Sequence, residues 1–236
     1  MFAAIGKKTP TVKPTWLTKM HFAGDSTTAD SNRLGNRSGY RQLFVDKIFA
    51  LYNYLMNHTT DIVGIQNPNN TGTAVPYCGL SGIRSDQLLA SYVGTGSGDG
   101  LDADKNKPKR VVLNIGFNDL LQDYLGCRTA PHTQLTTQIG LIIDVYKVAD
   151  PTVQVVVCNL WDNSAQPAAF ASAQAYIKSY IEGRGDYGVN SFVFDSFSAM
   201  GAYSGTYWPD ITHLNNAGNV IFADALVARL RVLFEA

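Results

Sequence analysis

Short apolar runs alternate with segments of helical periodicity along this chain, and this alternation limits the possible folds more than any other feature. The apolar runs that predict strands lie at residues 19–24, 61–65, 110–116, 153–158 and 192–195. The segments with apolar residues at helical spacing lie at residues 38–56, 83–92, 133–148, 167–182 and 215–234. Strands that alternate with helices predict a parallel sheet covered by helices on both faces. We therefore expect an α/β fold of three layers, α/β/α, around a five-stranded parallel sheet.

The order of the strands follows from the handedness of the connections. Right-handed crossovers and five strands favour the flavodoxin-like order 2-1-3-4-5. In that order the first and third strands end beside the same crevice, where ligands bind in open α/β sheets. The 236 residues, 45% of them hydrophobic, suit one domain, 1–236, in which 1–18 form a loosely structured lead-in.

Composition excludes several classes of partner. The net charge is zero and no basic stripe is present, so we expect no nucleic-acid partner. No apolar run is long enough to cross a bilayer, so we expect no membrane partner. The apolar part of residues 1–8 is too short for a full signal peptide. Low lysine and glutamate, with many Gly, Asn, Ser, Thr and Tyr, favour a secreted protein, which we expect to be a monomer. Three glycosylation sequons are present, a number that chance explains in an asparagine-rich chain.

The first strand ends in Gly24-Asp25-Ser26, ahead of a predicted turn and helix. A serine at the carboxyl edge of a sheet, followed by a helix, has its hydroxyl exposed near backbone N–H groups. Ser26 is therefore a candidate nucleophile. The alternative is that these residues form a turn with a helix cap.

Two other segments offer groups that a serine nucleophile needs. Asn118 follows the third strand, where its amide can donate to a developing oxyanion or merely form a polar turn. His213 alone among the four histidines lies on a loop after the last strand with an aspartate, Asp210, three residues earlier. A serine needs a base, and the base needs an orienting acceptor. The alternative is that Asp210 and Asn215 only cap the final helix.

These segments, in order, resemble the four conserved blocks of the SGNH (GDSL-type) hydrolases over roughly residues 19–230. The matching residues are Gly24-Asp25-Ser26, Gly82, Gly116-x-Asn118-Asp119 and Asp210-x-x-His213. The resemblance implies that Ser26 is the nucleophile, His213 the base and Asp210 its orienting group. It also implies an oxyanion hole formed by the backbone N–H groups of Ser26 and Gly82 and the side chain of Asn118.

Three further segments look like carbohydrate esterase family three, which includes acetylxylan esterases. They are residues 38–43, 61–64 and 79–88. The chain departs from that family at Ile83, where an aromatic residue is frequent, and at Tyr77-Cys78, where histidine and glutamate are usual. The resemblance implies a serine esterase that removes acetyl groups from a polysaccharide such as xylan, without metal or other cofactor. The alternatives are a rhamnogalacturonan or pectin acetylesterase, a lipid esterase, and a non-catalytic carbohydrate-binding protein.

Aromatic residues in the loops after the fourth and fifth strands are candidates for binding sugar faces. They are Trp161, Tyr207 and Trp208, with Tyr203 nearby. The alternative for each is that it packs in the interior. We also expect Asp25, next to the candidate nucleophile, to contact substrate.

Three cysteines are present, and no two are spaced as in a zinc ribbon. Cys78 precedes Gly82 by four residues, and Cys127 lies on the loop that follows Asn118. We expect a disulfide between these two loops, with Cys158 free on the fourth strand. The alternative is three unpaired thiols.

Overall fold

The computed structural model describes residues 13–29, 40–52, 56, 61, 78–79, 82–93, 107–208, 210 and 212–235. Its centre is a parallel sheet with the strand order β2-β1-β3-β4-β5. The strands are β1 (Met20–Gly24), β2 (Cys78–Gly79), β3 (Arg110–Asn114), β4 (Gln154–Cys158) and β5 (Ser191–Phe194). The predicted α/β fold with a parallel sheet is confirmed.

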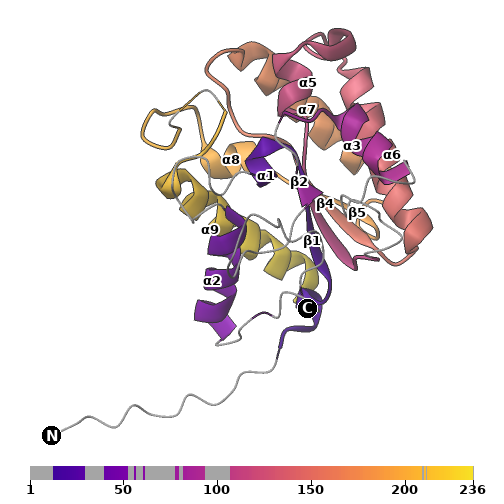
Figure 1. The fold of residues 1–236 in the computed structure, drawn as a ribbon, viewed down its shortest axis with the longest axis vertical. Helices are drawn as coiled ribbons and strands as arrows, with labels where there is room; N and C mark the ends of the chain where they lie inside the picture. The colour runs from indigo at the N-terminus through magenta and orange to yellow at the C-terminus, as the bar shows by residue number, and fades with distance from the viewer. Residues whose placement is uncertain are drawn as a thin grey trace, which may run out of the picture.

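Helices lie on both sides of the sheet. They are α1 (Ser26–Ala29), α2 (Tyr40–Tyr52), α3 (Ser85–Val93), α5 (Phe117–Leu121), α6 (Thr133–Ala149), α7 (Pro167–Glu182), α8 (Ser196–Met200) and α9 (Asn216–Phe234). Two 3-10 turns cover Thr15–Leu17 and Tyr124–Gly126. Helices α2 and α9 pack together on one side of the sheet, and α3 and α6 pack together on the other (Figure 1).

The central strands are mostly apolar and buried because helices cover them from both sides. All five residues of β1 are buried, as are the last four residues of both β3 and β4. Helix α9 begins where its sequence predicts, since the side chain of Asn215 accepts a hydrogen bond from the backbone N–H of Gly218 at 3.0 Å. Pro167 occupies the first turn of α7, where its missing N–H costs nothing.

The predicted second strand, residues 61–65, lies almost entirely outside the described residues. Of residues 61–65, the described part of the chain includes Asp61 alone, and the backbone N–H of Met20 donates to its carbonyl oxygen at 2.6 Å. The chain at Asp61 therefore lies beside the start of β1. The described strand β2 pairs with the end of β1, through Ala23 with Cys78 and Gly24 with Gly79.

The predicted disulfide between Cys78 and Cys127 is wrong, because Cys127 is a free thiol, as is Cys158. Cys127 is 1% exposed and belongs to the hydrophobic core, although its sequence context predicts a surface loop. Burial raises the pKa of its thiol to about 12. A thiol in this environment seldom ionises, and it is the thiolate that forms disulfides.

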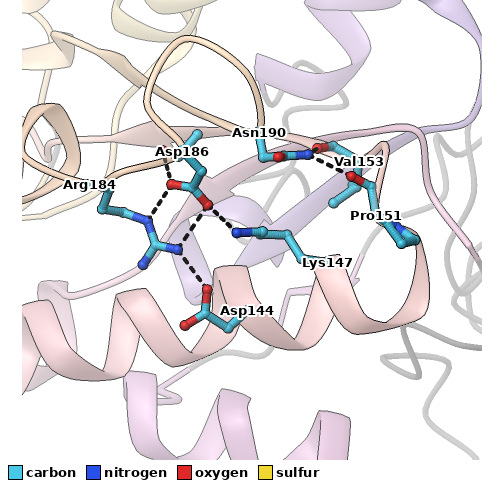
Figure 2. A network of polar contacts seen from close by, with 8 residues as sticks. Asp144, Lys147, Pro151, Val153, Arg184, Asp186 and Asn190 are labelled. Atoms are coloured by element: carbon cyan, nitrogen blue, oxygen red, sulfur yellow. Dashed lines mark hydrogen bonds and ion pairs between the residues drawn. The ribbon is translucent and has the colours of Figure 1, made fainter.

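A network of charged side chains lies at the edge of the sheet where β4 and β5 begin (Figure 2). Asp186 accepts hydrogen bonds from Arg184 Nε at 2.9 Å and from Lys147 Nζ at 2.5 Å. Arg184 also donates to Asp144 at 2.6 Å, and Asn190 donates to two backbone carbonyls just before β4. The hydrogen bond from Arg184 holds the pKa of Asp186 well below its usual range. The network ties α6 to the turn that leads into β5.

In the described ranges, no helix combines the length and the apolar content that a membrane crossing requires.

Candidate active site

Strands β1 and β3 end side by side, which sets the position of Ser26. Gly24, the last residue of β1, pairs with Asn114, the last residue of β3. A Cβ atom on Gly24 would lie 2.0 Å from the carbonyl oxygen of Asn114, so no other residue fits without moving the backbone. This close approach lets the chain pass from the strand directly into Asp25 and the first turn of α1.

The structure brings together the three residues predicted as a catalytic triad. Nε2 of His213 lies 2.9 Å from Oγ of Ser26, although the two residues are 187 positions apart. Nδ1 of the same ring lies 2.8 Å from Oδ2 of Asp210. Because an ionised carboxylate can only accept, Nδ1 carries the proton and Nε2 is free to accept from the serine hydroxyl.

Asp210 is held in the ionised form that this tautomer requires. Its Oδ1 accepts hydrogen bonds from the backbone N–H groups of Thr212 at 2.8 Å and His213 at 2.7 Å. Partial burial opposes ionisation, but these hydrogen bonds and the imidazole together lower the pKa of Asp210. Asp210 therefore fixes both the backbone of the turn and the orientation of the ring.

The loop after β4 supports the histidine turn from behind. The indole Nε1 of Trp161 donates to the carbonyl oxygen of Thr212 at 2.9 Å. The side-chain amide of Asn163 donates to the hydroxyl of Thr212 at 3.3 Å. The ring of Trp161 is 1% exposed and packs against Phe117 and Phe222. Trp161 thus anchors the turn to the core.

The burial of Trp161 contradicts part of the prediction that loop aromatic residues bind sugar faces. Trp161 and Trp208, which is 2% exposed, have no ring face available to a sugar, so the packing alternative holds for both. Tyr207 is half-buried and remains a prediction. The expected substrate contact of Asp25 is also wrong, because that side chain is completely buried.

The segment at Gly82 is fastened to the start of α5. Gly82 has φ +78°, a left-handed conformation that favours glycine. One N–H of the Asn118 amide donates to the carbonyl oxygen of Ile83 at 3.0 Å. The backbone N–H of Ser85 donates to the carboxyl group of Asp119 at 3.0 Å, and its hydroxyl also donates there at 2.5 Å. These contacts place Asn118 next to the Gly82 segment.

The sequence analysis missed three polar residues that support the site: Asn114 and Thr212, which are buried, and Thr27, which is half-buried. The side chain of Asn114 donates a hydrogen bond to the hydroxyl of Thr27 beside Asp25. Thr212 accepts the hydrogen bond from Trp161 in the loop after β4. Asn114 could have been found, because a polar side chain closes an otherwise apolar central strand at the residue opposite Gly24. No comparable sequence pattern marks Thr212.

The site thus consists of a serine, a histidine and an aspartate that meet at the carboxyl edge of a parallel α/β sheet. We compared the chain with known proteins that could share this fold and arrangement. No protein-family model matches the chain, and no curated protein matches it in sequence.

Solved structures do match. A carbohydrate esterase family 3 protein from Talaromyces cellulolyticus is 19% identical, with a TM-score of 0.69, over 92% of this chain and 98% of that one. A family 3 carbohydrate esterase from Clostridium thermocellum is 20% identical, with a TM-score of 0.64, over the same shares of the two chains. An acetylxylan esterase from Geobacillus stearothermophilus is 19% identical, with a TM-score of 0.61, over 90% of this chain and 94% of that one. The chain therefore shares the fold of these esterases, as the sequence resemblance predicts.

Proposed function

We propose that this protein is a serine esterase that removes acetyl groups from a polysaccharide such as xylan. The observation that carries the proposal is the position of His213, whose ring contacts Ser26 through one nitrogen and Asp210 through the other. The shared fold with carbohydrate esterases of family 3 supports the choice of ester and substrate.

In the proposed first step, Oγ of Ser26 attacks the acetyl carbonyl carbon while Nε2 of His213 takes the hydroxyl proton. Asp210 stabilises the imidazolium that forms. The sugar oxygen then leaves with the proton from His213, and the acetyl group remains on Ser26. In the second step His213 takes a proton from water, the resulting hydroxide attacks the acetyl-enzyme, and acetate leaves as Ser26 regains its proton.

The tetrahedral intermediates of both steps carry a negative oxygen. We assign its stabilisation to the backbone N–H groups of Ser26 and Gly82 and to the side chain of Asn118. The Asn118 amide has two N–H bonds. The one that donates to Ile83 fixes the plane of the amide, and we assign the other to the oxyanion.

The decisive test is acetate release from a panel of polysaccharides: acetylated xylan, acetylated pectin and acetylated rhamnogalacturonan, with a small aryl acetate as a reference. We expect the fastest release from xylan and none from the Ser26→Ala variant. Preference for pectin or rhamnogalacturonan would change the substrate but keep the mechanism. Hydrolysis of long acyl esters in preference to acetyl esters would favour a lipid esterase. Failure to release acetate from every ester would remove the esterase proposal.

We also propose that Tyr207 contacts the sugar, that the protein is a monomer and that it is secreted. Tyr207→Ala should raise KM for the polysaccharide and leave KM for the aryl acetate unchanged. Light scattering would test the monomer, and detection of the protein outside its native cells would test secretion.

A further inference from the structure

Asp25 and Asn114, which are buried, and Thr27, which is half-buried, form a polar cluster where β1 leads into Ser26. The hydroxyl of Thr27 accepts a hydrogen bond from Nδ2 of Asn114 at 2.9 Å. The same hydroxyl donates to Oδ1 of Asp25 at 2.7 Å, and the backbone N–H of Thr27 donates to that oxygen at 2.9 Å. Because a hydroxyl has one proton, the direction of this chain of hydrogen bonds is fixed from Asn114 through Thr27 to Asp25.

The residue at each end of this series of hydrogen bonds has one further side-chain oxygen. Within the described ranges, Oδ2 of Asp25 and Oδ1 of Asn114 are both buried and have no hydrogen-bond partner. A buried acceptor without a donor is destabilising, and such atoms are rare in native proteins. The two residues are adjacent, since the backbone N–H of Asp25 donates to the carbonyl oxygen of Asn114 at 3.3 Å. A proton on Oδ2 of Asp25 would turn that oxygen into a donor, and Oδ1 of Asn114 is an acceptor without a donor.

We propose that Asp25 is a neutral carboxylic acid at neutral pH, that it donates from Oδ2 to Oδ1 of Asn114, and that it acts as a positioning residue for Ser26. The proton closes the hydrogen-bonded ring of Asp25, Asn114 and Thr27. Because Asp25 and Thr27 flank Ser26 in the chain, the ring fixes the turn that presents the serine hydroxyl. The role at Ser26 rests on the proposed esterase function, whereas the proton itself does not.

The charges around Asp25 favour the neutral form. Burial raises the pKa of Asp25 to about 6 against the opposing effect of the two hydrogen bonds from Thr27. Asp119, on α5, raises the pKa further, and His213, on the loop before α9, lowers it. A pKa of about 6 alone would leave Asp25 mainly ionised at pH 7. The neutral form at that pH therefore depends on the hydrogen bond that the acid donates to Asn114, which exists only in the neutral form and raises the pKa further.

Neutrality also suits the proposed chemistry. The transition state places negative charge on the substrate oxygen near Ser26, and a carboxylate one residue away would oppose that charge. Ionisation of Asp25 at alkaline pH would both open the ring and introduce this repulsion. The alkaline limb of the activity profile should therefore include the ionisation of Asp25.

Infrared difference spectroscopy tests the proton without any need for activity. The wild type minus Asp25→Asn spectrum at pH 7 should contain the C=O stretch of a protonated carboxylic acid. The matched control is the wild type minus Asp186→Asn spectrum, which should contain carboxylate bands alone because Arg184 lowers the pKa of Asp186. Carboxylate bands alone for Asp25 would overturn the proposal, whether or not the protein proves to be an esterase.

Unfolding gives a second readout that is independent of the reaction. The pKa of Asp25 is 3.8 in the unfolded chain, and burial and the proposed hydrogen bond to Asn114 both raise it in the folded protein. Folding is therefore favoured by protonation, and the protein loses stability as the pH rises from 4 to 7. Relative to the Asp25→Asn variant, the wild-type unfolding constant should increase roughly 600-fold between pH 4 and pH 7, because only the unfolded state releases the Asp25 proton over this range. No change with pH, or a change of opposite sign, would contradict a protonated Asp25.

The positioning role is tested by kinetics. The amide of the Asp25→Asn variant can donate to Asn114 as the acid does, so its kcat should stay within about threefold of wild type and should not fall at alkaline pH. Asp25→Ala should lower kcat with little change in KM, and if it does not fold, the first variant decides. A folded Asp25→Asn protein with kcat reduced about 100-fold would show that the negative charge is needed, and would refute the proposal.

Discussion

Substitution of Asn118 by alanine separates catalytic from structural effects in the proposed oxyanion hole. The substitution removes two hydrogen bonds, one to the carbonyl oxygen of Ile83 at 3.0 Å and one assigned to the substrate oxyanion. Loss of the first should lower the free energy of unfolding by about 0.5–1.5 kcal/mol. Loss of the second should raise the activation barrier by about 2.7–4 kcal/mol, which lowers kcat by about 100- to 1,000-fold. The effect on activity should therefore clearly exceed the effect on stability.

Two measurements on the same preparation are required: kcat and KM on a small aryl acetate, and unfolding by urea. Ser85→Ala is the matched control, because it removes a hydroxyl that donates to Asp119 and loosens the same segment, while both N–H bonds of Asn118 remain. We expect its kcat to fall less than about 10-fold. Equal losses of kcat in the two variants would refute the reasoning, since the loss would then come from the loosened segment. An effect on KM alone would make Asn118 a substrate-positioning group.

Three other predictions concern separate parts of the molecule. Ser26→Ala should lower kcat by several orders of magnitude with an unchanged urea midpoint, and Asp210→Asn should cost less; near-normal turnover of the serine variant would end the assignment of the nucleophile. Arg184→Ala should lower the free energy of unfolding by about 2 kcal/mol, because it leaves the partly buried carboxylate of Asp186 poorly paired, and kcat should not change. Thiol titration of the unreduced protein should find Cys127 and Cys158 unreactive before denaturation and reactive after it; a single thiol in the denatured protein would restore the disulfide.

Much of the fold could be predicted because strands and long helices carry repeating patterns. Helix α7 begins at Pro167 and ends at Glu182, as its periodicity predicts. The meeting of Ser26 and His213 could be anticipated because strand ends in a parallel sheet share one edge. By contrast, α5 and α8 have five residues each, too few for a periodic pattern, and their sequences do not distinguish them from turns.

The errors at the site have one physical cause: sequence shows which residues lie in a loop but not which way their side chains point. Trp161 follows a strand in a loop, and so it was expected to contact sugar, but the interior between Phe117 and Phe222 accommodates its ring. Cys127 also follows this pattern, because the sequence places it in a loop but its side chain points into the core. The full burial of Asp25 was equally hidden, because the residue types around it are common in exposed turns.

The charged network around Arg184 lies where β4 and β5 begin (Figure 2). Ser26, by contrast, follows the end of β1. Strands of four or five residues separate these two edges by roughly 13–17 Å. Substitutions more than about 7–10 Å apart that share no contacts usually have additive effects. A laboratory selection for heat tolerance could therefore draw on the residues around Arg184, and a separate selection for new substrates could vary the opposite edge. The gains could then be combined in a single chain.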